Sequence, residues 1–510
     1  MFPRADPRAD RWAILALLCF SLLLIAVDAT VLHIAVPALT AALEPTGVQL
    51  LWIIDVYSLV VAPLLVTFGT LGDRYGRRRL VLLGYVVFGA ASLAAAFAAS
   101  PEALIVARAF LGVGGAMIMP ATLSIIRQVF TDRRERAIAL GVWSATAAGG
   151  AAVGPVVGGV LVEHFWWGTV FLINVPLLVV ALPLAARLIP DVSECHGHSW
   201  DGLSALLSVV GVLAVAFGLK EAGYGHTVGR GAAVLILLAG VAVLAWFVAR
   251  QRALASPLLD LGLFANRGFA TGVACVLFAV FALVGLELLL AQYLQLVLGL
   301  SPLGAALRML PLMVAAICGG LAAAHVLQRA GLRATMSGGL TLTALSLLPT
   351  LGWGVEDHPV SLTLCFVGIG FGIEVALLAA SDAIMSAAPE SRAGGAAAVE
   401  ETAYELGAGL GIAVLGTVTT LVYAPGIVAP GVPGDLIAQA KGSLAAAAHV
   451  AGDLGGPAGV ALLQVARTAF VSGLHVAVGV SVVLLLANAF VVAVLVPSRE
   501  RRTENERLSV

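Results

Sequence analysis

Charged residues are scarce in this sequence. Asp, Glu, Lys and Arg together make up 11% of the 510 residues, whereas 60% are hydrophobic, and the mean hydropathy is +1.03. Soluble proteins carry about 25% charged residues, so this composition excludes a soluble globular enzyme and a disordered protein. The net charge of −1 leaves no basic surface for DNA or RNA, and we expect no nucleic-acid partner.

Cysteine is also scarce, and its positions follow no pattern. The five residues stand singly, at Cys19, Cys195, Cys275, Cys318 and Cys365. This spacing excludes a disulfide framework and gives no metal-ligand spacing, so we read Cys195 and the two histidines that follow it as part of a solvated linker. The GxxxxGK[ST] loop that binds ATP phosphates is absent as well. We therefore expect no cofactor, and energy from an ion gradient or a partner.

Long apolar runs dominate the sequence. A membrane-spanning helix needs about 20 apolar residues, and fourteen runs reach that length. The runs are 13–37, 49–71, 80–99, 102–126, 137–162, 168–187, 201–220, 231–249, 268–298, 303–327, 334–354, 359–387, 394–423 and 468–496. The sequence predicts an all-α polytopic membrane protein with fourteen spans.

Basic residues are distributed unevenly between the two sides that these spans define. Of the 28 Lys and Arg residues, 22 fall on the side of the termini, and only Lys220, Arg230, Lys441 and Arg467 fall on the other side. Cytoplasmic loops carry the excess of basic residues, so both termini are predicted to be cytoplasmic. The remaining two, Arg108 and Arg308, fall inside spans.

The spans group as six, two and six. Residues 1–187 are predicted to form the first group, 188–267 a linker with two additional spans, and 268–510 the second group. The second group contains one long extracellular loop at 424–467, in which 434–449 fits a short surface helix. A loop of this length is either functional or flexible, and we expect flexible cover.

Eight acidic residues lie within the predicted spans. They are Asp28, Asp55, Glu287, Glu374, Asp382, Glu400, Glu401 and Glu405. A charge at the centre of a span costs about 2.5–3.5 kcal/mol, and only two arginines oppose these acids. The acids must line a watery cavity, bind protons or lie near the interface. An apolar cavity with unpaired carboxylates favours protons and lipophilic cations.

The densest acidic cluster is AAAVEETAYELGAGLG at 396–411. Glu401 and Glu405 share one helix face, and Glu400 is rotated from Glu401 by about 100°. Tyr404 lies beside Glu405 and can stack on a cation. Two neighbouring carboxylates in a low dielectric cannot easily both stay ionised, so one is expected to exchange a proton.

Four further residues in the first spans are candidates for a functional or a structural role. Asp28 lies deep in the first span, far in sequence from any basic residue, and we expect a functional role for it. For Asp55, which is nearer the outer face, an outer gate or a structural bond competes with proton coupling. Arg108 is either a counter-ion or a proton relay. We expect His33 to be a buried, hydrogen-bonded group.

Two glycine-containing motifs stand out. The loop GTLGDRYGRRRL at 69–80 contains Gly69, Gly72, Asp73, Arg74, Gly76 and Arg77. Its glycines permit a tight turn between helices, and Asp73 can pair with Arg77. The fifth span contains Gly150, Gly154, Pro155, Gly158 and Gly159. These small residues permit close helix packing.

With AVDATVLHIAVP around Asp28, LWIIDVYSL and AVEETAYELG, these motifs make the chain resemble the major facilitator superfamily. The resemblance is to its fourteen-span drug:proton antiporters that export quaternary ammonium compounds and dyes. It implies two six-helix bundles around a central cavity, with the additional pair beside them, and alternating access. It assigns Asp28, Asp55, Glu400, Glu401 and Glu405 as functional carboxylates, a gating role to the 69–80 loop and proton transfer to Arg108.

The sequence departs from the family pattern at two places. His33 stands where the first-span motif usually has Asn, and the span 303–327 contains Arg308 but no acid, which argues weakly against dicationic substrates.

We therefore expect a monomeric, proton-coupled exporter of lipophilic cations in a bacterial inner membrane, with Na⁺ left open as the coupling ion. The alternative is a dedicated exporter of one endogenous metabolite or antibiotic. Sugar or nutrient uptake, a membrane-embedded enzyme and a channel fit the residues less well.

Overall fold

The structure is a computed structural model that describes residues 7–190, 201–224, 229–254, 257–259, 261–388 and 393–496. Within these ranges the chain forms helices and loops and no strand, as the all-α prediction requires. The Cys195 cluster and, for side chains, Asp73 and Arg74 lie outside the described residues.

The first group of helices spans the first 188 residues. Its members are α1 (Pro7–Leu43), α2 (Gly47–Tyr75), α3 (Arg77–Ala96), α4 (Pro101–Val129), α5 (Arg133–His164), α6 (Thr169–Leu172) and α7 (Asn174–Leu188). α1 packs against α5, and α4 packs against both α2 and α3. Polar caps begin several helices. Thr46 forms a capping box with Gln49 at the start of α2, and Ser100 caps α4 just before Pro101.

The second group follows residue 260. It contains η1 (Leu261–Ala265), α10 (Arg267–Gln292), the π-helical turn η2 (Tyr293–Val297), α11 (Pro302–Leu347), η3 (Leu348–Gly352), α12 (Pro359–Ala387), α13 (Ala393–Gly426), α14 (Gly434–Ala440), α15 (Leu444–Leu454) and α16 (Gly456–Leu495). α11 packs along α12, and α10 packs against α13. The two bundles meet where α2 packs on α13, α5 on α11 and α1 on α10.

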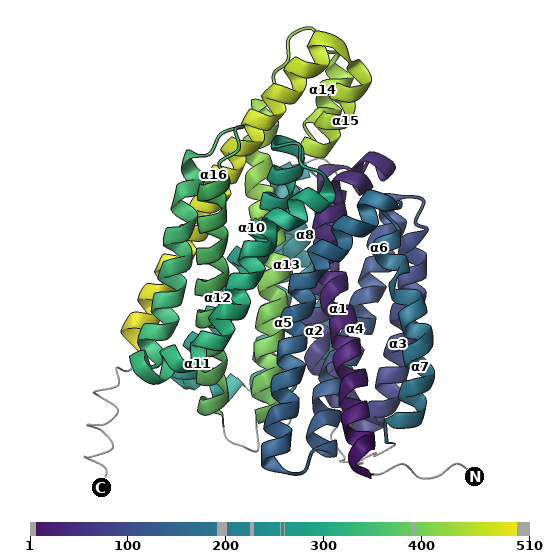
Figure 1. Ribbon diagram of the computed structural model, residues 1–510, viewed down its shortest axis with the longest axis vertical. Coiled ribbons are helices and arrows are strands. Elements are labelled where there is room, and N and C mark those ends of the chain that lie inside the picture. The colour runs from purple at the N-terminus through teal and green to yellow at the C-terminus, as the bar shows by residue number, and fades with distance from the viewer. Residues whose placement is uncertain are drawn as a thin grey trace.

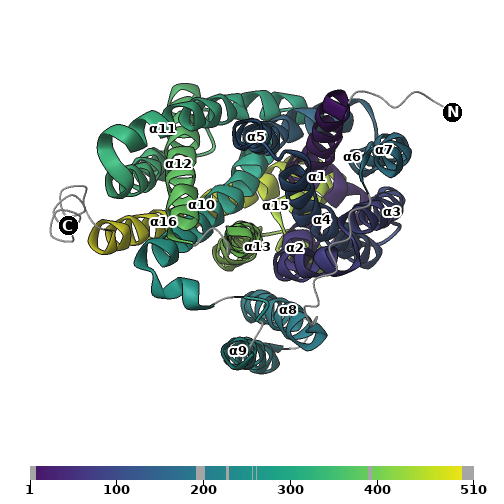
Figure 2. The same ribbon diagram turned by 90° about the horizontal axis from the view of Figure 1, so that it is seen from below.

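The two additional helices, α8 (Gly202–Tyr224) and α9 (Gly229–Ala253), stand outside both bundles. Figure 2 shows them beside α2 and α13, and α8 packs against both of these helices. The outward face of α9 is apolar, with Leu235 and Trp246 exposed. An apolar face of this kind is typical of contact with lipid.

The predicted long loop is helical over much of its length. Residues 434–454 form the two helices α14 and α15, and α16 begins at Gly456, so residues 456–467 belong to a helix rather than to a loop. We call α14 and α15 the hairpin, and the end of the molecule that carries it the hairpin end (Figure 1). α1 begins and α16 ends at the opposite end.

Every one of the fourteen predicted ranges falls in a helical segment, but twelve helices among the described residues are long and apolar enough to cross a membrane. α11 covers two predicted ranges and is broken at Gly331, where φ is 78°. α5 covers the range 137–162, although only its Val153–His164 part counts as a shorter apolar helix. The count of fourteen and the cytoplasmic termini stay predictions.

Candidate functional site

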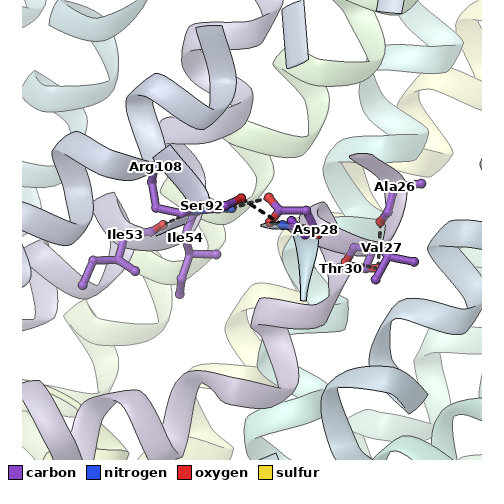
Figure 3. Close-up of polar contacts among 9 residues, drawn as sticks. Ala26, Val27, Asp28, Thr30, Ile53, Ile54, Ser92 and Arg108 are labelled. Atoms are coloured by element: carbon purple, nitrogen blue, oxygen red, sulfur yellow. Dashed lines mark hydrogen bonds and ion pairs between the residues drawn. The ribbon is translucent and has the colours of Figure 1, made fainter. Parts of the chain in front are cut away.

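Asp28 lies in a buried ion pair with Arg108. The Arg108 Nη1 atom of α4 lies 3.1 Å from the Asp28 Oδ2 atom of α1, and both side chains are at most 1% exposed. Arg108 also donates to the backbone oxygens of Ile53 and Ile54 in α2, each at 3.1 Å (Figure 3). One guanidinium therefore joins three helices.

The second oxygen of the Asp28 carboxylate is satisfied as well. Asn174 of α7 donates to Asp28 Oδ1 at 2.8 Å and lies 3.1 Å from the Ser92 hydroxyl of α3. Sequence reasoning missed Asn174 and Ser92. It noted that Asp28 is far in sequence from any basic residue, and the partner indeed lies 80 residues away. The counter-ion reading of Arg108 is confirmed by this pair.

Asp55 is also paired, with a residue that the sequence analysis placed at the outer end of the predicted run 201–220. The Lys220 Nζ atom of α8 lies 2.7 Å from Asp55 Oδ1, with neither side chain exposed. The same ammonium lies 3.6 Å from the ring centre of Trp52. Lys220 is therefore a buried counter-ion inside the predicted span region, and the structural bond weighed for Asp55 is present.

The acids of the second bundle gather around Tyr404. Tyr404 of α13 lies within electrostatic range of Glu401 and Glu405 of the same helix, of Glu374 of α12 and of Glu287 of α10. Glu374 and Glu287 were seen as span acids but were not selected as site residues. Their signal was the acidic side chain itself, and the packing of α10 and α12 brings them to α13.

The partners of the α13 acids are neutral hydroxyls. Glu405 interacts with the hydroxyl of Ser58 of α2, and Glu400 interacts with that of Ser381 of α12. In the described part of the chain, Glu374, Glu400, Glu401 and Glu405 make no ion pair. Asp28 and Asp55, which are paired, thus belong to the first bundle, and these four acids of the second bundle make no ion pair among the described residues.

Tyr57 connects the two sets of charges. Its ring lies 5.0 Å from the Arg108 guanidinium, and it is within electrostatic range of Asp28, Glu401 and Glu405. The Tyr57 hydroxyl is buried without a hydrogen-bond partner among the described residues. Tyr57 and Ser58 therefore link the Asp28–Arg108 pair to the acids of α13.

The 69–80 motif forms the tight turn that its glycines predict. Gly76, with φ of 100°, joins α2 to α3 and donates to the Gly72 oxygen at 3.0 Å. Arg77 donates to the Ser124 oxygen of α4 at 3.3 Å, and Gly69 faces Pro120 of the same helix. The motif thus joins the ends of three helices.

The glycines of the fifth-span motif are close-contact positions. A Cβ atom at Gly150, Gly154 or Gly158 would lie 2.7, 1.9 or 2.8 Å from atoms of α1. A Cβ at Gly159 would lie 3.0 Å from Leu303 of α11, and Pro155 is buried. The motif therefore sets the approach of α5 to α1 and, at Gly159, to the other bundle.

Arg308 lies away from these charges. It pairs with Asp357 at 2.7 Å, with about a third of each side chain exposed. The argument against dicationic substrates treated Arg308 as a charge within a span that lacks an acid. Since Arg308 is neutralised near the surface and Glu374 joins the central acids, that argument loses its basis.

Comparisons with known proteins agree with this arrangement. The family model of the Major Facilitator Superfamily matches residues 18–412. The chain is 42% identical to the methyl viologen resistance protein SmvA of Salmonella typhimurium, over 94% of this chain and 97% of that protein. It is 41% identical to the multidrug efflux pump LfrA of Mycolicibacterium smegmatis, over 95% and 96% of the two chains.

A solved structure with the same fold is a bacterial homologue of the human lysosomal transporter Spinster, in an inward-facing and unoccupied conformation. The TM-score is 0.67 at 18% identity, over 95% of this chain and 97% of that chain.

Proposed function

The chain belongs to the major facilitator superfamily, and from that premise we propose that it is a proton-coupled multidrug antiporter that exports lipophilic cations. The relatives support drug efflux across a bacterial inner membrane by a multi-pass transporter. The substrates we propose are quaternary ammonium compounds, dyes such as ethidium, and bipyridinium dications of the methyl viologen type.

The observation that carries this proposal is the set of buried acids around Tyr404. Glu374, Glu401 and Glu405 have no cationic partner among the described residues, whereas Asp28 and Asp55 each have one. Unpaired carboxylates beside an aromatic ring attract an organic cation through charge and through the face of the ring. We therefore place the substrate at α13 rather than at Asp28.

Proton coupling follows from competition for these carboxylates. A buried carboxylate without a counter-ion binds a proton readily, because burial penalises its charged form. A cation can take the place of that proton. Substrate binding then requires deprotonation on the cytoplasmic side, and protonation from outside releases the cation. Glu401 and Glu405 carry this exchange, and Tyr57, Ser58 and Arg108 connect it to the first bundle.

The test uses inside-out membrane vesicles with an imposed proton gradient, recorded with a pH-sensitive dye. Adding ethidium or methyl viologen is expected to collapse part of the gradient in vesicles with the wild-type protein. Glu401→Gln is expected to abolish the collapse. Asp382→Asn is the matched control, because it removes an exposed acid from α12 and is expected to behave as the wild type.

Three outcomes separate the alternatives. No collapse with any lipophilic cation, in protein shown to be folded and inserted, would favour a dedicated exporter of one metabolite. Collapse that persists in Glu401→Gln would remove that residue from the exchange. A response to an imposed Na⁺ gradient in place of the proton gradient would identify Na⁺ as the coupling ion.

A further inference from the structure

We propose that His33 and Glu287 form a second proton-binding site, built across the contact between the two bundles. His33 belongs to α1 and Glu287 to α10, and 4.0 Å separates His33 Nδ1 from Glu287 Oε1. Only 3% of the His33 side chain and 9% of the Glu287 side chain are exposed. The inference rests on the proposed proton antiport, but on different residues from the Glu401–Glu405 exchange.

The charge of the pair depends on whether it has bound a proton. A neutral imidazole beside an ionised carboxylate leaves one uncompensated buried charge, which is costly. His33 Nδ1 also has no hydrogen-bond partner among the described residues. Binding of one proton between the two groups removes both deficits, either as an imidazolium–carboxylate pair or as a neutral pair. A buried His–Glu contact of this kind therefore takes up one proton when it forms.

The ionisable groups around Glu287 are mostly acids, since Glu374 of α12 and Glu401 and Glu405 of α13 are within electrostatic range of the same Tyr404. On α16, which also packs on α10, Arg467 donates to the Leu296 oxygen and His475 contacts the Trp353 oxygen. On α1 itself the next ionisable residue is Asp28, which Arg108 of α4 neutralises. On α13 it is Tyr404, which is within electrostatic range of Glu287. The α5 segment that packs on α1 carries no ionisable residue from Gly150 to Val162.

The sides facing α11, α12 and the hairpin add no further basic partner in the described part. On the side of α11 and α12, Glu287 lines a small cavity and is the only ionisable residue in its lining. The ionisable groups of the hairpin that approach α1 are His449 and Asp453, beside Glu44 at the end of that helix. No basic residue other than His33 is thus paired with Glu287 in the described part.

The position of the pair couples its proton to the movement of the bundles. One residue further along α1, the backbone oxygen of Ile34 accepts a hydrogen bond from Gln295 of η2 at 3.2 Å. His33–Glu287 and this bond both exist only while α1 and α10 touch. When the bundles separate at the hairpin end, both side chains become hydrated and the shared proton loses its second partner.

The position of the pair indicates the step of the transport cycle at which it binds its proton. After a substrate leaves toward the hairpin side, a proton taken up by His33 and Glu287 stabilises the closed contact between α1 and α10. The proton must leave before the bundles can separate again at that end. Since Glu287, Glu401 and Glu405 are all within electrostatic range of Tyr404, we expect release toward the opposite side by way of the acids that bind substrate.

The experiment measures protons moved per ethidium exported, with purified protein in liposomes. A pH dye trapped in the lumen and ethidium fluorescence report the two fluxes. Glu287→Gln is expected to lower the ratio by one proton, because the neutral His33 that remains gains no proton on closing. The double variant His33→Asn/Glu287→Gln is expected to match Glu287→Gln rather than lose a further proton. His33→Asn alone leaves Glu287 as a buried carboxylate that still gains a proton, so it is expected to keep the wild-type ratio. Glu287→Asp keeps the acid and is expected to keep the wild-type ratio.

Gln295→Leu is the matched control. It removes an inter-bundle contact beside the pair without removing an ionisable group, so it is expected to change the rate but not the ratio. An unchanged ratio in Glu287→Gln, with coupling intact in the wild type, would overturn this inference alone. A lower ratio in the double variant than in Glu287→Gln would show that His33 binds a proton of its own and would overturn the pairing. Absence of coupled proton flux in the wild type would overturn the proposed function. A lowered ratio in Gln295→Leu would show that mechanical weakening suffices and would also overturn the second site. Should Glu287→Gln fail to fold, the double variant still decides the question.

Discussion

Arg108 holds three helices with a single buried charge. Its three guanidinium nitrogens reach Asp28 of α1 and two backbone oxygens of α2, and the rings of Tyr57 and Phe171 lie against it. A planar fork can satisfy several acceptors at once, which an ammonium group cannot do with the same geometry. The counter-ion and relay readings of Arg108 are therefore compatible, since the residue that neutralises Asp28 also lies within range of Glu405.

The buried pair makes a prediction about stability. Asp28→Asn leaves Arg108 as an uncompensated buried charge, and removing one partner of such a pair costs about 3–5 kcal/mol. We expect Asp28→Asn and Arg108→Gln each to lower the unfolding temperature of the purified protein in detergent. The double variant should lose much less than the sum of the two, because no unpaired charge remains. Additive losses in this cycle would show that the two side chains are not coupled.

The sequence did not predict which basic residue pairs with which acid. The acids were visible as rare charges in apolar runs, but nothing in the sequence indicated that Asp28 meets Arg108 or that Asp55 meets Lys220, 165 residues away. Lys220 ends the predicted run 201–220 and precedes Glu221, so it was placed at the outer end of a span. It lies buried because α8 packs on α2, and that contact depends on the whole fold.

At the scale of elements, α8 and α9 are joined at one end by a charged contact. Asp201 accepts hydrogen bonds from Arg250 Nε and Nη2 at 2.9 and 3.0 Å, and one from the Ser204 hydroxyl at 2.6 Å. The Arg250 hydrogen bonds, and to a smaller extent those from Ser204, lower the pKa of Asp201 to about 2. The carboxylate therefore stays ionised at all physiological pH values.

The lowered pKa of Asp201 determines how its contribution to folding stability changes with pH. An unfolded Asp has a pKa of about 3.9, so the stabilisation by Asp201 is complete above that value and is lost as the pH falls through about 2. We expect Asp201→Asn to lower the unfolding temperature by the same modest amount at pH 5 and at pH 8, because the pair is partly exposed. Asp435→Asn, on the exposed start of α14, is the control. A difference that grows between pH 5 and pH 8 would contradict the assignment.

The contact of α5 with α1 makes a second prediction at this scale. A Cβ at Gly154 would lie 1.9 Å from Thr30 Oγ1, whereas a Cβ at Gly149 meets nothing within 4 Å. Overpacking of a close contact costs typically about 1–3 kcal/mol. We expect Gly154→Ala to lower both the unfolding temperature and the ethidium export rate, and Gly149→Ala to leave both unchanged. Equal effects of the two substitutions in the same assays would show that helix propensity, and not the α1 contact, decides the outcome.

Helix positions were largely predictable, and helix ends were not. Apolar length alone located every range, because a span cannot be much shorter than the hydrocarbon core. α16 nevertheless begins at Gly456, where the Gly and Pro content of the preceding loop hid a helix start. Pro457 in the first turn of α16 is a start signal, because the N–H group that proline lacks would have no partner within the helix at that position. The break of α11 at Gly331 falls between the predicted ranges 303–327 and 334–354, so its position was predicted from the sequence.

At the scale of the whole molecule, the paired and unpaired acids divide between the bundles. In the first bundle, the two acids that lie within predicted spans, Asp28 and Asp55, are both in ion pairs, so their charges are fixed in place. The second bundle carries acids that the described residues leave without a cation, and it meets the first at Ser58 and at His33. The hydrogen bonds and ion pairs between the bundles in the described part lie in the middle and at the hairpin end. In the proposed antiport, motion about these contacts is therefore expected to change the surroundings of the unpaired acids and to leave the ion pairs of Asp28 and Asp55 intact.

Two exchange sites predict how the membrane potential acts. If Glu401–Glu405 and His33–Glu287 each carry one proton, export of a monovalent cation moves one net positive charge inward, worth about 2.3 kcal/mol per 100 mV. Export of a divalent cation against two protons moves none. In liposomes with a K⁺ diffusion potential, we expect an inside-negative potential to accelerate ethidium export and to leave methyl viologen export unchanged. In Glu287→Gln, which retains one exchange, ethidium export should lose its dependence on the potential. An equal response of both substrates in the wild-type protein would exclude two protons per cycle.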